Sequence, residues 1–163
     1  MNQVVKNTGD GAAILSLATD EDGVYGSGYD YYGSGGFEGT FRASSTGQIT
    51  WLDDCHGDTY SVYPAKEAVY AAGHKHYCGN IGGFAQTEPW DFYQATALSK
   101  QATGVVSRDT MGYPSFHNNP SPTLLDWFPA IDIGSFTGQS QAAWSVTGND
   151  DYMVYGGEFP KVN

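Results

Sequence analysis

The sequence predicts an all-β protein, and its composition is the first observation in favour. Of its 163 residues, 22 are glycine and 12 are tyrosine, while only 15% are charged. Many short strands joined by tight turns have this composition, whereas a helical protein carries more Leu, Glu, Lys and Arg. The 40% of residues that are hydrophobic are enough to form a sizeable core in a chain of this length.

A repeated pattern is the second observation. A pair of short apolar segments occurs three times, at residues 14–17 and 24–28, 60–63 and 69–73, and 144–147 and 154–158. When Val24, Val69 and Val154 are aligned, the copies are 45 and 85 residues apart. In each copy an acidic or polar turn separates the two segments. One offset is the typical length of a propeller blade and the other about twice that, so we expect propeller-type four-stranded antiparallel blades.

This period divides the chain into an N-terminal lead (1–9), a first blade (10–54), a second blade (55–130) and a partial third blade (131–163). Outer strands are expected at residues 37–43 and 48–52 in the first blade, and at 92–98 and 124–128 in the second. Residues 100–122, rich in Gly, Ser, Asn and Pro, form an insertion and a candidate contact surface.

About two and a half blades would leave an open arc with unpaired sheet edges. The chain stops within the third repeat. We therefore expect the last strand, residues 152–159, to pair with another protein chain or with the rest of a longer propeller.

The second repeat predicts a β-hairpin that carries both cysteines. If Pro64 faces Val69, the paired residue numbers sum to 133, and the same register sets Cys55 opposite Cys78. A disulfide is then geometrically plausible, and closing this loop would add about 3 kcal/mol to stability. The alternative is two reduced cysteines in the core.

Three histidines in the same region are candidate metal ligands. His74 and His76 are two apart and share one face of the strand, and His56 and Asp58 lie nearby, which is ligand chemistry for a zinc ion. The register that pairs the cysteines puts His56 and Asp58 on the opposite face, unless a bulge at Gly57 breaks the ladder. The alternative is that the histidines are hydrogen-bonded supports. Calcium is a second candidate, at the acidic hairpin turns, although such turns are often acidic only because water surrounds them.

The charge of the chain restricts its partners. The formal net charge is −11, which repels nucleic acid and anionic membrane surfaces. The sequence contains no run of about eighteen apolar residues, so it predicts no membrane-spanning helix. Residues 1–6 lack the apolar core of a secretory signal. Together with a disulfide, this favours a piece of a longer secreted protein or a component of a virion surface.

Catalytic motifs are missing from the sequence. It contains no Gly-x-Ser-x-Gly, no phosphate-binding glycine loop and no His-Glu-x-x-His. Asp53, Asp54 and Asp58 offer a carboxylate pair for glycoside hydrolysis, but such pairs arise easily by chance in an acidic chain. We therefore expect no enzyme activity.

Exposed aromatic residues favour binding of a glycan by stacking on sugar rings. Candidate ligand contacts are Trp90 and, in the insertion, Tyr113, Phe116 and His117. The alternative is that the aromatic residues fill the space between blades.

The C-terminal segment, residues 154–163, resembles the "xxxGGxFxxVNG" hallmark of the delta-sixty repeat. Further segments resemble segments that occur in the same order in proteins with this repeat: residues 54–59, 74–78, 81–84, 125–129 and 141–148. This propeller-like repeat is found in large secreted proteins of actinobacteria and in minor tail proteins of their phages. The resemblance implies a non-catalytic scaffold or adhesin on an extracellular or phage-virion surface. The alternative is an accessory domain of a secreted hydrolase.

Overall fold

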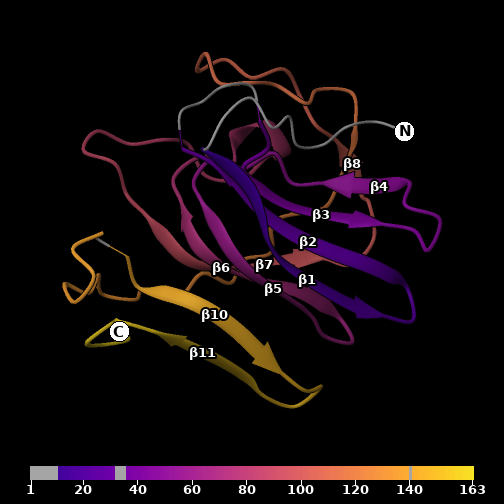
Figure 1. Ribbon diagram of the computed structural model, residues 1–163. Helices are drawn as coiled ribbons and strands as arrows, with labels where there is room; N and C mark the ends of the chain where they lie inside the picture. The colour runs from indigo at the N-terminus through magenta and orange to yellow at the C-terminus, as the bar shows by residue number, and fades with distance from the viewer. Residues whose placement is uncertain (1–10, 32–35, 140) are drawn as a thin grey trace.

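The computed structural model describes residues 11–31, 36–139 and 141–163, and in this part of the chain the regular structure is all β apart from one 3-10 turn, η1 (Gly79–Ile81). The sheets are antiparallel, so the all-β, antiparallel part of the prediction is confirmed. In this part of the chain the strands, most of which are labelled in Figure 1, are β1 (Ala12–Asp20), β2 (Gly23–Asp30), β3 (Gly39–Ala43), β4 (Ile49–Leu52), β5 (Thr59–Pro64), β6 (Ala68–Lys75), β7 (Tyr93–Ser99), β8 (Gly104–Val105), β9 (Pro120–Ser121), β10 (Ala143–Gly148) and β11 (Met153–Gly157).

The first sheet contains β1 to β4 in sequence order, as predicted for a four-stranded blade. Asp20 closes the turn between β1 and β2, because its Oδ1 accepts hydrogen bonds from the main-chain N–H groups of Asp22 (2.8 Å) and Gly23 (3.2 Å). Gly23 is required there, since it has a φ of +150° and a Cβ atom would collide with the carbonyl oxygen of Ala43. The local turn chemistry therefore fixes this hairpin.

The second sheet has three strands, β5, β6 and β7, and corrects one prediction. Residues 124–128 do not form a full fourth strand; they contribute a single bridge between Leu98 and Leu124. The main-chain N–H of Trp127 donates to the carbonyl of Leu125 (2.8 Å), so the chain turns away from β7 after one bridge. Residues 100–122, the predicted insertion, contain the short pair β8 and β9.

The third sheet consists of β10 and β11. The register corrects the offset between the second and third copies. Val62 pairs with Ala71 in one hairpin and Val146 pairs with Tyr155 in the other, so the copies are 84 residues apart instead of 85. Val154 is consequently the structural counterpart of Tyr70, and the alignment of Val154 with Val69 is wrong by one residue.

The same bulge interrupts the first strand of each sheet. The ladder skips one residue in β1, in β5 and in β10, and these residues are Leu15, Tyr60 and Trp144. They are 45 and 84 positions apart, so the bulge repeats with the hairpins. A bulge bends its strand and changes the direction of the side chains that follow.

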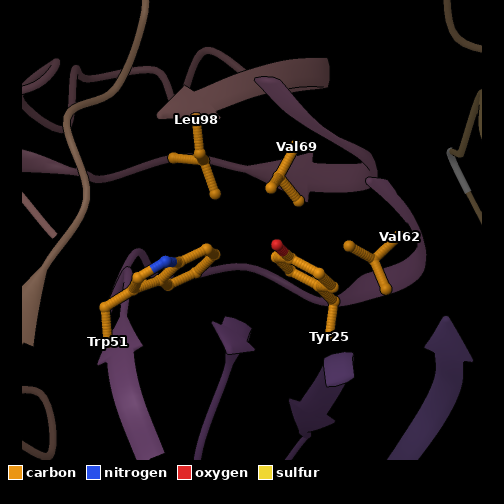
Figure 2. Close-up of a cluster of buried hydrophobic side chains, with 5 residues drawn as sticks. All are labelled: Tyr25, Trp51, Val62, Val69 and Leu98. Atoms are coloured by element: carbon orange, nitrogen blue, oxygen red, sulfur yellow. The ribbon is translucent and has the colours of Figure 1, made fainter. Parts of the chain in front are cut away.

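The three sheets stack in sequence order. β1 and β2 of the first sheet pack against β5, and β10 of the third sheet packs against β5 and β6 (Figure 1). A buried cluster lies between the first and second sheets (Figure 2) and contains Tyr25, Trp51, Val62, Val69 and Leu98. A second cluster, between the second and third sheets, is centred on Ala72, Ala143 and Val146. The strands that the structure describes form this stack and no closed ring.

The insertion is anchored to the first sheet. The carbonyl oxygen of Lys100 accepts hydrogen bonds from Trp51 Nε1 (2.8 Å) and from Arg42 Nη1 (3.0 Å). Val106 of the insertion is buried against Phe37 and Leu52. These contacts hold the insertion against the first sheet.

Candidate functional site

A cavity of about 810 Å³ lies where the first strands of the three sheets begin and where β2 and β6 end. The three bulged residues, Leu15, Tyr60 and Trp144, all line it. The repeated bulge therefore directs one apolar or aromatic side chain from each sheet into a common space.

The cavity wall combines aromatic rings with acceptor groups. The aromatic residues that line it are Tyr29, Tyr31, Tyr60, Trp90, Phe92, Tyr113 and Trp144. Its polar side chains are those of Asp30, Glu38, His56, Asp58, His74, His76, Gln139 and Gln141. Among the described residues, no lysine or arginine lines the cavity.

The predicted disulfide is confirmed and lies beside this cavity. Cys55 and Cys78 are bonded, with Cα atoms 4.4 Å apart, and neither is free. A bridge between His56 and Tyr77 follows the predicted register, and so do the pairs from Ser61 to Pro64.

The register is broken between the His56–Tyr77 bridge and the pairs that begin at Ser61. This corrects the prediction that His56 and His74 lie on opposite faces. Tyr60 is skipped on β5, and Thr59 pairs with Gly73. Gly57 has a φ of +113°, and a Cβ atom there would collide with the carbonyl oxygen of His74. His56 and Asp58 consequently line the same cavity as His74 and His76, as the bulge at Gly57 would allow.

Hydrogen bonds engage the histidine rings. His74 Nδ1 lies 2.8 Å from Gln141 Oε1, His76 Nδ1 lies 2.9 Å from Gln86 Oε1, and His56 Nε2 lies 3.1 Å from Asp109 Oδ2. Within the described part of the chain, no group of three or more His, Cys, Asp or Glu side chains is placed to hold a metal ion. The geometry therefore favours hydrogen-bonded supports over a zinc site.

The first acidic turn, a calcium candidate, has a different partner. Lys100 Nζ lies 2.7 Å from Asp20 Oδ2 and 3.3 Å from Asp22 Oδ2. An ammonium group thus occupies the position that a cation would take.

Burial sets the protonation of the cavity groups. It raises the pKa of Asp58, and the charge of His74 partly offsets this. Burial also lowers the pKa of His76 below its usual value, so this ring is neutral at neutral pH. The described wall residues include carboxylates and no lysine or arginine, a composition that disfavours anionic ligands.

Two of the four predicted ligand contacts lie in the cavity. Trp90 and Tyr113 line it. Phe116 instead packs edge-on against Phe37, with ring centroids 5.6 Å apart. His117 lies outside the cavity wall, and its ring is 3.3 Å from Arg108 Nη2.

The carboxylates considered for hydrolysis have different surroundings. Asp53 is buried against Lys75 (2.7 Å), and Asp54 accepts a hydrogen bond from the main-chain N–H of Phe116 (3.1 Å). Of the three, only Asp58 lines the cavity.

Sequence reasoning missed Leu15, Tyr60, Phe92, Gln141 and Trp144 as cavity residues. The aligned repeats carried a signal for part of this set, because a large side chain precedes Ser16, Ser61 and Ser145 in all three copies.

Comparison of the chain with protein-family models, with curated proteins and with solved structures finds no match. In the part of the chain that the structure describes, no helix has the length and apolar character needed to cross a membrane.

Proposed function

We propose that this chain is a non-catalytic, propeller-type module that binds a sugar in the cavity and serves as an adhesin or scaffold on an extracellular or phage-virion surface. The observation that carries the proposal is the cavity wall, in which aromatic rings surround carboxylate, amide and imidazole groups. Sugar recognition needs this combination, because ring C–H faces stack on aromatic side chains while hydroxyl groups need hydrogen-bond partners.

Two tryptophans are the main stacking candidates. Trp90 stacks on His76, with ring centroids 4.3 Å apart, and its side chain is still 43% exposed. Trp144 contacts Tyr60, with centroids 4.6 Å apart. Neighbouring rings thus hold both indoles in place, and a preorganised contact loses less entropy when a ligand binds.

The charge of the cavity predicts which sugars bind. Glu38 and Asp58 contribute carboxylates, and no lysine or arginine of the described residues lines the wall. Neutral and amino sugars are therefore favoured, and sulfated or carboxylated sugars are repelled.

The disulfide and the repeated hairpins support the remaining parts of the proposal. Disulfides persist in oxidising surroundings, which fits an extracellular or virion location. Hairpins with the same bulge and the same two-residue turn fit blades of a propeller, and the delta-sixty repeat remains our proposal for their type. An accessory domain of a secreted hydrolase is the alternative, and it would use the same cavity.

The test is a binding screen with oligomers of glucose, N-acetylglucosamine and glucosamine, and with a sulfated oligosaccharide. Tryptophan fluorescence reports binding, because Trp90 and Trp144 line the cavity. We expect a neutral or amino oligomer to bind and the sulfated one not to bind.

Trp144→Ala should weaken the binding about fivefold or more, since losing a stacked ring costs on the order of 1 kcal/mol or more. The matched control is Trp127→Ala, because Trp127 contacts Tyr70 and Tyr155 and does not line the cavity. Preferential binding of the sulfated oligomer, or equal loss in both variants, would contradict the proposal.

A further inference from the structure

A hydrogen bond that repeats between neighbouring sheets shows how one sheet docks on the next. The residue after each bulge is a serine: Ser16, Ser61 and Ser145. Ser16 Oγ accepts from the main-chain N–H of Val62 (3.4 Å), and Ser61 Oγ accepts from that of Val146 (3.1 Å). In both cases the donor directly follows the equivalent serine of the next sheet. The contact is therefore a property of the repeat.

The third sheet carries the same serine on an uncovered face. The counterparts of Val154 are Tyr25, which is buried against the second sheet, and Tyr70, which packs against the third. Val154 itself is 59% exposed, and Ser145 is also exposed. We call the surface formed by Ser145, Thr147 and Val154 the leading face.

The first sheet, at the opposite end of the stack, also has an exposed apolar side chain. Leu17 of the first sheet is the counterpart of Val62 and Val146, which are 3% and 6% exposed, but it is 67% exposed itself. It lies over Gly26 beside the ring of Phe41. We call the surface formed by Leu17, Gly26 and Phe41 the trailing face.

We propose that the leading face binds the trailing face of a second copy of this chain, head to tail. Ser145 Oγ accepts from the main-chain N–H of Leu17 in the second copy, in the way that Ser16 accepts from Val62. Val154 packs against that Leu17 as Tyr25 packs against Val62 within the chain (Figure 2).

The second copy is the occupant because the exposed faces at the two ends of the described stack correspond to the two sides of the contact between neighbouring sheets. The contact continues an interface that the chain already forms twice, between its first and second sheets and between its second and third. A contact between different faces is heterologous, so two copies with three sheets each would give a ring of six, within the four to eight blades of known propellers. The inference rests on the repeat architecture of the proposed function and is independent of sugar binding.

The experiment measures the solution mass of the full chain by light scattering over a range of concentrations. We expect a mass above 17.5 kDa that falls on dilution. Leu17→Glu and Val154→Lys should each raise the dissociation constant at least tenfold, because each places an unpaired charge in an apolar contact. The double variant should recover association, since every contact then sets the introduced carboxylate of one copy opposite the introduced ammonium group of the next.

Both substituted side chains are exposed, so the fold should persist, and the melting temperature checks this. Val105→Lys is the matched control: Val105 is 60% exposed on β8, outside both faces, and the variant should associate like the unmodified protein. A monomer of 17.5 kDa at all concentrations, or a double variant no better than the single ones, overturns the proposal. Sugar binding by Val154→Lys, measured in parallel, shows whether the proposed function fails or only this contact.

Discussion

Replacing Lys75 by Met should destabilise the fold more than most single substitutions. Lys75, at the end of β6, is 2% exposed, and its Nζ lies 2.7 Å from Oδ2 of Asp53, which is fully buried after β4. The pair therefore joins the first and second sheets. Methionine fills a similar volume but leaves the Asp53 carboxylate buried without its cation. The carboxylate keeps the hydrogen bond that it accepts from the main-chain N–H of Cys55 (3.1 Å). Breaking a buried ion pair in this way costs about 3–5 kcal/mol.

Urea unfolding measures this cost. With a slope of about 2 kcal/mol per molar urea, the midpoint should fall by roughly 2 M. The control is Asp53→Asn in the Lys75→Met background, because the amide removes the buried charge and still accepts from Cys55. We expect this double variant to be more stable than Lys75→Met alone. A loss below about 1 kcal/mol in the single variant, or a double variant that is less stable still, would refute the reasoning.

Three further predictions concern the surroundings of this pair. Burial raises the pKa of Asp54 from 3.8 to about 7, so the folded state binds a proton that the unfolded state releases between these values. Its contribution to stability is therefore complete below pH 3.8 and is lost as the pH rises through about 7, by at most about 4 kcal/mol. The melting temperature should thus fall between pH 5 and pH 8 in the unmodified protein and fall less in Asp54→Asn; equal slopes would contradict the assignment. Replacing Cys55 and Cys78 by alanine removes a crosslink with a sequence separation of 23, so the free energy of unfolding in urea should drop by about 3 kcal/mol, and a drop below 1 kcal/mol would argue against it. Gly57→Ala should lower the melting temperature, because a methyl group at a φ of +113° meets the His74 carbonyl, whereas Gly47→Ala, at a φ of +79° with open space around it, should lower it less.

Much of the hairpin structure could be predicted from the sequence because cross-strand pairing is local. The turn at Asp20 and Gly23, the pairing of Pro64 with Val69, and the opposition of Cys55 and Cys78 all follow from side-chain alternation and turn chemistry. No knowledge of the neighbouring sheets is needed for any of them.

The cavity was decided by the tertiary structure. One skipped residue reverses the parity of a strand, so a strict alternation put His56 and His74 on opposite faces, whereas both line the cavity. Leu15, Tyr60 and Trp144 meet only because three bulged strands stack in order.

One strand end was not predicted from the sequence. Residues 124–128 resemble a strand, yet the hydrogen bond from Trp127 to Leu125 ends the pairing after one bridge. The sequence by itself thus determined the hairpins, their turns and the disulfide, since these depend on residues close together in the chain. The tertiary structure alone decided which side chains share the cavity and which faces stay open, since both depend on how whole sheets pack.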